Sequence, residues 1–291
     1  MQQENEEKKI KKVAEAEKLA VLQANLRAWN YWGRTWRFGR KKRPLTPYAL
    51  RLMKTRALTY RKVYLKIITS AKGLKGKIIL DVGCGTSEYL RWLSDDGDSL
   101  VGIDISVEML KLCREDIGKS IKLIAADALH LPLKDGVFDI GMTFQSLHHF
   151  PDWKRALSEL VRTSRWVILY EPNADSVLHK IMHWVRKTFH VEQRFRQTDE
   201  DYELVEYHAS GFSSARIMDF LVRKDIFTEV FMFGTFPVSL LEKVFRLSTH
   251  LAFLLLAFDD FLGKMPIIRK QLGGFLVIGR KNELCGKPCD H

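Results

Sequence analysis

Acidic residues and glycines follow the short apolar runs in the middle of the chain at a spacing that suits a nucleoside ligand. Asp81 lies at the end of one such run, before a bend that contains Gly83 and Gly85, and Asp104 ends the next run, 19 residues after Gly85. The two glycines allow a tight turn and let a ligand approach the main chain. A carboxylate at the end of the second strand accepts hydrogen bonds from two vicinal ribose hydroxyls. Asp127 ends the third run, so the pattern predicts a nucleoside-binding crevice.

The bend differs from the pyrophosphate-binding fingerprint of dinucleotide enzymes. Cys84 separates the two glycines, and Glu88 stands where that fingerprint has its third glycine. Acids at the ends of three neighbouring strands suit a nucleoside that carries a cationic group, and they disfavour a polyphosphate. Taken singly, Asp81 and Asp104 are also compatible with structural roles at strand ends.

Two adjacent histidines, His148 and His149, follow the fourth apolar run and are candidates for a catalytic base. Neutral imidazole accepts a proton near pH 7. The alternative is that one of the two orients the loop or packs beneath the ligand. Glu171 ends the fifth run and also has two interpretations, contact with a substrate or a structural role at the strand end.

These residues need a scaffold that brings strand ends together. From Lys77 onward, short apolar runs alternate with charged helical windows, of which the clearest follow Thr86, Ser106 and Pro151. This alternation predicts a parallel sheet with helices on both faces. The seven predicted strands span residues 77–83, 99–104, 121–127, 137–144, 165–172, 228–236 and 273–281.

The order of four motifs identifies a family. They read L-D-V-G-C-G-T, G-I-D-I-S, A-A-D-A and F-D-I-G-M-T-F-Q-S-L-H-H-F-P-D-W. Over residues 77–172 this order resembles the class I S-adenosylmethionine-dependent methyltransferases, specifically the small-molecule group called type 11. The resemblance implies a Rossmann-like α/β fold with a mostly parallel sheet of order 3-2-1-4-5-7-6 and an antiparallel last strand. It also implies S-adenosyl-L-methionine as the cofactor.

The resemblance assigns cofactor contacts to the ends of the first four strands. The residues it implies are Asp81, Gly83, Cys84, Gly85, Asp104, Ile105, Met109, Asp127, Ala128 and Phe144. Asp81 is expected to face the methionine amino group, and Asp104 to hold the ribose hydroxyls. Ile105 and Met109 are expected to flank the adenine. Asp127 and Ala128 should meet the polar edge of the adenine, and Phe144 should border the methionine.

The chemistry of this family is an in-line displacement at a sulfonium methyl group, in which the protein mainly positions the reactants and excludes water. A base is needed only where the acceptor is a hydroxyl, an acidic carbon or a protonated amine. A related group of quinone O-methyltransferases binds a divalent metal through carboxylates in the loop after the fourth strand. Here Gln145 and His148 stand in their place, so we expect no metal.

The charge of the chain is unevenly distributed. The 291 residues carry a formal net charge of +12. Residues 1–77 hold 21 Lys and Arg against 5 Asp and Glu, and the rest of the chain holds 26 against 30. We therefore expect a basic helical extension over residues 1–76 and a methyltransferase domain over 77–281, with an apolar helical insert at 237–266 and a tail at 282–291.

The sequence predicts a cytoplasmic enzyme. The N-terminus lacks the apolar run of a secretory signal, and the longest uncharged apolar stretch near the C-terminus, residues 247–258, is shorter than the roughly 20 residues that span a bilayer. The tail contains Cys285, Cys289 and His291 but no fourth zinc ligand, so it is expected to bind no metal.

Two hypotheses for the methyl acceptor remain open. In the first, the apolar insert forms the wall of a site for a small lipophilic or lipid acceptor, and residues 27–77 rest on an anionic membrane surface. In the second, the basic aromatic segment holds RNA, with bases stacked on tryptophan and phosphates bound by arginine. The apolar insert favours the lipophilic acceptor. A binding or scaffold module is the non-enzymatic alternative.

Overall fold

The computed structural model describes residues 76–86, 99–117, 121–177, 211–233 and 273–282, together with isolated positions between 23 and 30, between 180 and 188, and at 265. Within these residues one sheet has the strand order β3-β2-β1-β4-β5-β7-β6. The strands are β1 Ile78–Val82, β2 Ser99–Asp104, β3 Ile121–Ala125, β4 Phe138–Phe144, β5 Ser164–Pro172, β6 Ile226–Phe233 and β7 Gly274–Lys281. β7 runs antiparallel to β5 and β6, and the pairs among β1 to β5 are parallel. The predicted fold class and strand order are confirmed.

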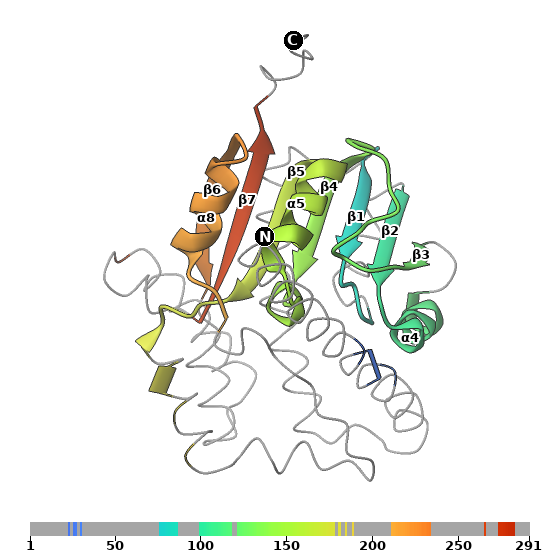
Figure 1. Cartoon of the computed structure of the whole chain (residues 1–291), viewed down its shortest axis with the longest axis horizontal. Coiled ribbons are helices and arrows are strands. Elements are labelled where there is room, and N and C mark those ends of the chain that lie inside the picture. The colour runs from blue at the N-terminus through green and yellow to red at the C-terminus, as the bar shows by residue number, and fades with distance from the viewer. Residues whose placement is uncertain are drawn as a thin grey trace, which may run out of the picture.

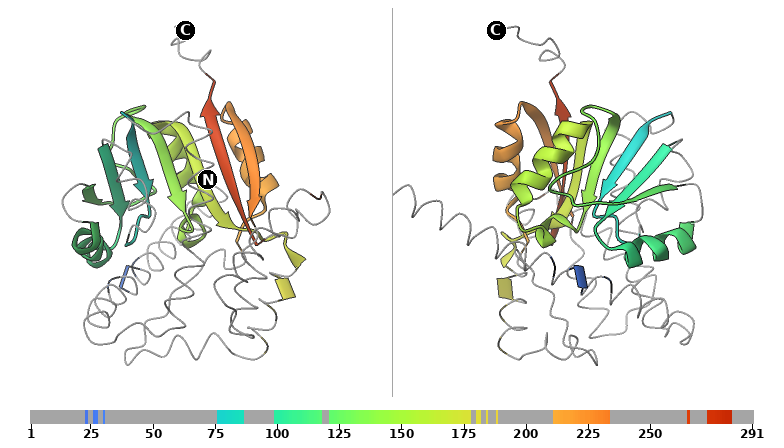
Figure 2. Two further views of the ribbon diagram at one scale, coloured as in Figure 1. Left: turned by 180° about the vertical axis from the view of Figure 1, so that it is seen from behind. Right: turned by 45° about the vertical axis from the view of Figure 1, so that its right-hand side comes forward.

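The strands are apolar on both faces because both faces of the sheet are covered. Along β1, Leu80 and Val82 belong to one apolar core and Ile79 belongs to the other, as the alternation of side chains along a strand requires. Leu157 of helix α5 and Ile217 of helix α8 pack in the first core. Figures 1 and 2 show these two helices on the same face of the sheet.

The described helices are α4 Val107–Ile117, α5 Trp153–Thr163, α8 Ser214–Val222 and the 3-10 turn η1 Leu147–His149. Two of them match predicted windows. Helix α5 begins after Asp152, whose side chain accepts a hydrogen bond from the backbone N–H of Arg155 and so caps the first turn. Helix α8 was not predicted, and its Leu221 packs in the same core as α5.

Several predictions concern residues outside the described ranges. They are the helical window after Thr86, most of the extension at 1–76, nearly all of the insert at 237–266 and the tail from residue 283 onward. The domain boundaries therefore remain predictions. Among the described residues, no helix is both long and apolar enough to cross a membrane.

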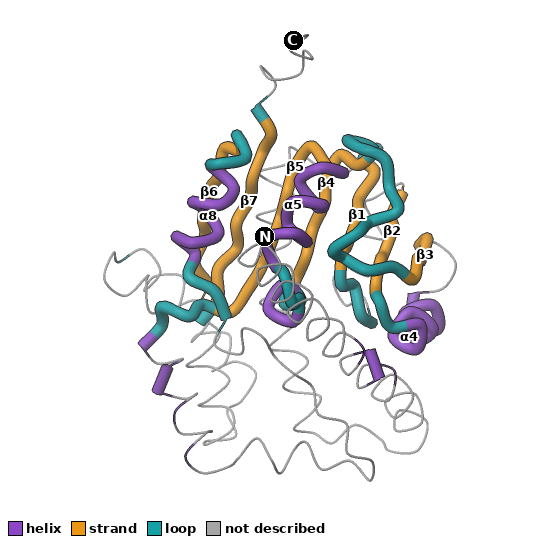
Figure 3. The backbone as a smooth tube through the Cα atoms, in the orientation of Figure 1, coloured by secondary structure: helices purple, strands orange, loops and turns teal. Residues whose placement is uncertain are grey.

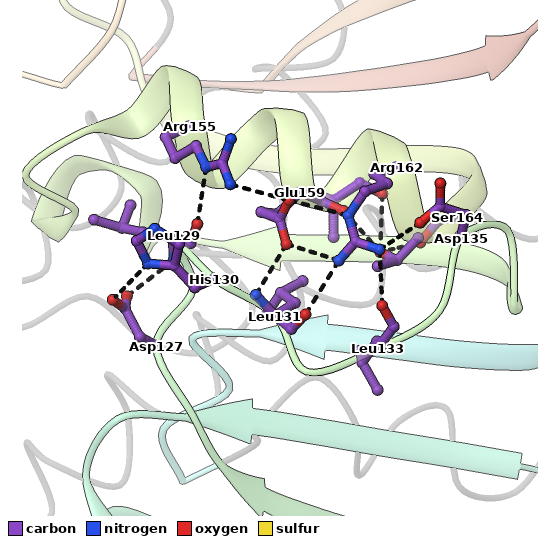
Figure 4. A network of polar contacts seen from close by, with 12 residues as sticks. Asp127, Leu129, His130, Leu131, Leu133, Asp135, Arg155, Glu159, Arg162 and Ser164 are labelled. Carbon is purple, nitrogen blue, oxygen red and sulfur yellow. Dashed lines mark hydrogen bonds and ion pairs between the residues drawn. The ribbon is translucent and has the colours of Figure 1, made fainter.

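An ion pair between the partly exposed Arg162 and the buried Glu159 fixes the loop between β3 and β4 to helix α5 (Figure 4). The Arg162 guanidinium donates to the backbone carbonyls of Leu131 and Leu133 and to the carboxylate of Glu159. Glu159 also accepts from the Leu131 N–H at 2.9 Å, and its side chain is 8% exposed. The hydrogen bond from Arg162 lowers the pKa of Glu159. This pairing therefore stabilises the fold at neutral pH, and its contribution is lost as the pH falls through the lowered pKa.

We expect Arg162→Ala to lower the free energy of unfolding by about 3 kcal/mol, because it leaves the buried Glu159 charge without its partner. Arg165→Ala is the matched control. Arg165 is 73% exposed and 3.8 Å from Asp139, so its loss should change stability by less than about 0.5 kcal/mol. Urea unfolding monitored by tryptophan fluorescence measures both values, and equal losses would contradict the assignment.

Candidate functional site

The turn after β1 begins the candidate site. The backbone N–H groups of Gly83 and Cys84 donate to the carbonyl of Ile103 at 2.8 and 3.0 Å, which fixes the turn to the end of β2. Because parallel strands end at the same edge of a sheet, this turn and the segment after β2 lie together (Figure 3).

The two glycines of the turn are required for different reasons. Both have positive φ, 74° at Gly83 and 51° at Gly85, a region that side chains disfavour. A Cβ at Gly83 would lie 2.7 Å from the side chain of Ser146 and 3.1 Å from that of Phe150. A Cβ at Gly85 would meet nothing within 4 Å. Packing within the protein thus explains Gly83, whereas Gly85 faces open space in which a ligand has room.

Asp104 connects the turn after β1 to helix α4. One carboxylate oxygen accepts from the Gly85 N–H at 2.8 Å, and the other accepts from the Ser106 N–H at 2.8 Å. Burial raises the pKa of Asp104, and the hydrogen bonds from the backbone N–H groups of Ser106, Gly85 and Ile105 act in the opposite direction. The carboxylate is therefore held in one orientation at the carboxyl end of β2.

Asp81 has a buried carboxylate oxygen that lacks a hydrogen-bond donor among the described residues. The residue is 2% exposed, and its Oδ1 has no hydrogen-bond partner among the described residues. Burial, and then the nearby charge of Asp104, raise the pKa of Asp81 to about 8. An ammonium group placed here would supply both the missing donor and the missing charge. The Asp81 carboxylate thus fits a ligand with a cationic amine.

The start of helix α4 receives two side-chain caps. The Ser106 hydroxyl accepts from the Met109 N–H at 3.2 Å and donates to the Asn30 side-chain oxygen at 2.7 Å. Asn30 also accepts from the Glu108 N–H at 3.4 Å. A residue from the predicted helical extension therefore contacts the segment between Asp104 and Met109. Met109 itself is buried, with 4% exposure.

Asp127 organises the segment after β3 at the same edge. Its carboxylate accepts from the Leu129 N–H at 2.9 Å and lies 3.5 Å from Nδ1 of His130. Ala128, the next residue, is buried. Phe144, at the end of β4, is buried as well, with 6% exposure.

The loop after β4 is held by a buried serine. Gln145 has a φ of 51°, the left-handed region, and its N–H donates to the Tyr170 carbonyl at 2.7 Å. This conformation turns the chain at the strand end. The Ser146 hydroxyl then contacts the Thr143 hydroxyl at 2.6 Å and the Val82 carbonyl at 3.2 Å. The loop after β4 is thereby fixed to the end of β1.

Glu171 and the two histidines form the other half of the site. Glu171 is fully buried and accepts from the backbone N–H groups of Ser146 and Leu147 at 3.1 and 2.8 Å. Its second oxygen lies 2.7 Å from Nδ1 of His148. The rings of His148 and His149 contact each other at a tilt of 46°, with centroids 4.0 Å apart. Burial, and then His148, lower the pKa of His149 to about 3, so His149 is neutral near pH 7.

The predicted site residues follow the strand ends as the topology requires, but sequence reasoning missed four contacts. Ser106, Asn30 and Ser146 were not singled out, and Glu171 was left with two interpretations. A serine before an amphipathic run is a helix-cap signal, so Ser106 could have been found. The contact with Asn30 joins residues 76 positions apart and has no local signal. No three His, Cys, Asp or Glu side chains of the described residues are grouped as a metal site.

Residues 80–165 match a family model described as a methyltransferase domain. Over these residues the predicted resemblance to the class I S-adenosylmethionine-dependent methyltransferases is confirmed. The cofactor of this class is S-adenosylmethionine. The buried Asp81 carboxylate and the open space over Gly85 fit its amino group and its close approach to the backbone.

Relatives of the methyltransferase domain differ in substrate. A tRNA (carboxymethyluridine(34)-5-O)-methyltransferase of Xenopus tropicalis is 35% identical over 94 residues, which are 31% of this chain and 14% of that protein. A demethylmenaquinone methyltransferase of Lactococcus lactis is 25% identical over 177 residues, 54% of this chain and 68% of that one. The chain spans only about half or less of the length of two relatives it matches, 48% of one and 14% of the tRNA enzyme.

A solved structure shares the fold of the methyltransferase domain. It is the magnesium protoporphyrin IX methyltransferase of Synechocystis PCC 6803 with bound SAH. The two chains superpose with a TM-score of 0.57 at 14% identity, over 87% of this chain and 96% of the other.

We expect Asp81→Asn to stabilise the ligand-free protein. The pKa of Asp81 is about 8 in the folded chain and ordinarily 3.8. A raised pKa in the folded state means that stability is fully present below pH 3.8 and is lost as the pH rises toward 8. An amide does not ionise, so this loss does not occur in the variant. Its free energy of unfolding should exceed that of wild type by about 1 to 3 kcal/mol at pH 8 and by less at pH 5.

Chemical denaturation at pH 5, 7 and 9 measures the effect. Asp139→Asn is the control, since that carboxylate accepts a hydrogen bond from the Ile78 N–H at the opposite end of the sheet. It should bring no gain at any of these pH values. An Asp81→Asn variant that is less stable than wild type at pH 9 contradicts the assignment of Asp81 as an unsatisfied buried acid.

Proposed function

We propose that the protein binds S-adenosylmethionine at the carboxyl edge of the sheet and transfers its methyl group to an acceptor. The observation that carries the proposal is the buried, unpartnered Asp81 oxygen beside a glycine turn that faces open space. A protein that used this edge only for structure would gain nothing from an acid whose pKa is raised to about 8 by burial.

In this proposal the acids and the backbone hold the cofactor. Asp81 pairs with the amino group, and Asp104, held by two backbone N–H groups, accepts from the ribose hydroxyls. Gly83, Cys84 and Gly85 form the floor of the site. Ile105 and Met109 would flank the adenine, Asp127 and Ala128 would meet its polar edge, and Phe144 would border the methionine.

When bound, the cofactor supplies an electrophilic methyl group and a neutral leaving group. The protein then has to orient the reactants and to exclude water. The Ser146 hydroxyl fixes the loop after β4 to the end of β1, so that the acids and the histidines share one rigid edge. Tyr170 and Phe144 are buried beneath this edge and limit the entry of water.

For the acceptor we propose a small, lipophilic molecule. The similarity to a demethylmenaquinone methyltransferase over 54% of the chain supports this class. RNA is the second candidate, which the shorter similarity to a tRNA methyltransferase favours. Almost all of residues 27–77 and of the insert at 237–266 lies outside the described ranges, so contact with an anionic membrane stays a prediction from charge alone.

The cofactor site can be tested without an acceptor. Asp104→Asn should weaken S-adenosylmethionine binding by about 10- to 100-fold, because a hydrogen bond to a charged group contributes about 1.5–3 kcal/mol. Equilibrium dialysis with labelled cofactor measures the affinity, and Asp139→Asn at the opposite end of the sheet is the control. Wild-type affinity in the Asp104→Asn variant would overturn this site.

The acceptor class requires a transfer assay. Tritiated methyl groups should enter the lipid fraction of a source-cell extract in the presence of the wild-type protein, and the Asp104→Asn variant should lose that activity. Label that enters RNA, with retention on RNA that weakens steeply as salt is raised, would replace the lipophilic acceptor with the second candidate.

A further inference from the structure

We propose that Glu171 is a positioning residue that fixes His148 as the proton acceptor of the methyl-transfer reaction, and that the methyl acceptor therefore reacts at an atom that must lose a proton, such as a hydroxyl oxygen. The inference rests on the proposed methyl transfer and adds the chemical class of the acceptor. It comes from one arrangement of side chains at the ends of β4 and β5.

The Glu171 carboxylate is surrounded by donors. It has 0% exposure, and its Oε1 accepts from two consecutive backbone N–H groups, those of Ser146 and Leu147. Hydrogen bonds of this kind stabilise a carboxylate and fix its plane. The remaining oxygen, Oε2, is directed at Nδ1 of His148, 2.7 Å away. A buried carboxylate with a fixed orientation therefore lies against one ring nitrogen of His148.

The carboxylate determines which ring nitrogen of His148 carries the proton. An ionised Glu171 can only accept a hydrogen bond, so Nδ1 must be the protonated nitrogen of the neutral ring. Nε2 then bears the lone pair and is the atom that can take a proton. Glu171 also stabilises the imidazolium formed afterwards. The carboxylate thus orients the imidazole, and the imidazole can act as a general base on the acceptor.

The two histidines have different roles in this proposal. Glu171 from β5 and His149 from η1 both contact His148. The His148 side chain is 13% exposed and paired with a carboxylate, whereas burial and His148 lower the pKa of His149 to about 3. An imidazole with so low a pKa is a poor proton acceptor near pH 7. His149 therefore packs against His148 and keeps that ring in place.

The proposed step conserves atoms and charge. Nε2 of His148 takes the proton of the acceptor O–H, and the acceptor oxygen forms a bond to the methyl carbon. The bond between that carbon and sulfur breaks, and its electron pair stays on sulfur. The positive charge that leaves the sulfonium appears on His148, beside the Glu171 carboxylate, and the proton later passes to solvent. An acceptor that is already an anion would have no need of this pair.

Nitrogen-15 NMR of the full-length, histidine-labelled protein tests the tautomer without any acceptor. His148 is assigned by its absence from the His148→Asn spectrum. In wild type its neutral ring should carry the proton on Nδ1, and Glu171→Gln should lower its pKa because a neighbouring negative charge is removed. A ring protonated on Nε2 in wild type, or an unchanged His148 pKa in Glu171→Gln, overturns the proposal.

Kinetics provides the second readout. With tritiated S-adenosylmethionine and the extract fraction that wild type labels, Glu171→Gln and His148→Asn should each lower the rate at saturating cofactor by at least about tenfold, in the range of general-base effects. Cofactor affinity should stay within about twofold. In Glu171→Gln the acid limb of the pH–rate profile should also move to lower pH. Asp139→Asn, an acid-to-amide change remote from the site, should alter neither rate nor profile.

The outcomes separate this inference from the proposed function. If wild type binds no S-adenosylmethionine, the proposed function fails. If wild type transfers label and Glu171→Gln does so at the same rate with the same pH profile, methyl transfer stands and the role of Glu171 is wrong. His148→Asn keeps the question decidable should Glu171→Gln not fold, because His148 lies at the edge of the core.

Discussion

A buried carboxylate is costly unless its charge is balanced, and Asp81 is such a group at the end of the central strand β1. The register of β1 and β2 places Asp104 at the neighbouring strand end, where its carboxylate is used to hold the Gly85 and Ser106 N–H groups. Asp104 therefore raises the pKa of Asp81 and does not balance its charge. The protein retains an acid that destabilises its own ligand-free state, which is expected of a site built for a cation.

The rest of the edge depends on how this strand end is buried. Ser146 packs against Gly83 so closely that no Cβ fits there, and its hydroxyl bonds the carbonyl of Val82. The same residue donates its N–H to Glu171, which orients His148. Three strands, β1, β4 and β5, thus converge on one serine. The acids that we propose to hold the cofactor and the histidine that we propose to face the acceptor are therefore parts of a single packed unit.

The strands were predictable because they are apolar runs of five to nine residues, and their order followed from the motif resemblance. Helix α8 was not predicted, since its short sequence S-A-R-I-M-D-F-L-V differs little from a loop until Ile217 and Leu221 are seen to be buried. The acids and glycines of the site were predictable from type and spacing. The hydrogen bonds of Glu171 were not, because its partners lie 23 to 25 residues away and a strand-end acid has several possible uses.

The central claim is that the Asp81 side chain is neutral at pH 7 in the free protein and becomes a carboxylate when a cationic amine binds beside it. Calorimetry of S-adenosylhomocysteine binding in buffers of different ionisation enthalpy counts the protons released. Wild type should release about one proton at pH 7 and Asp81→Asn essentially none, because only a group that changes its pKa on binding can give up a proton. Tight binding to wild type without proton release would contradict the account.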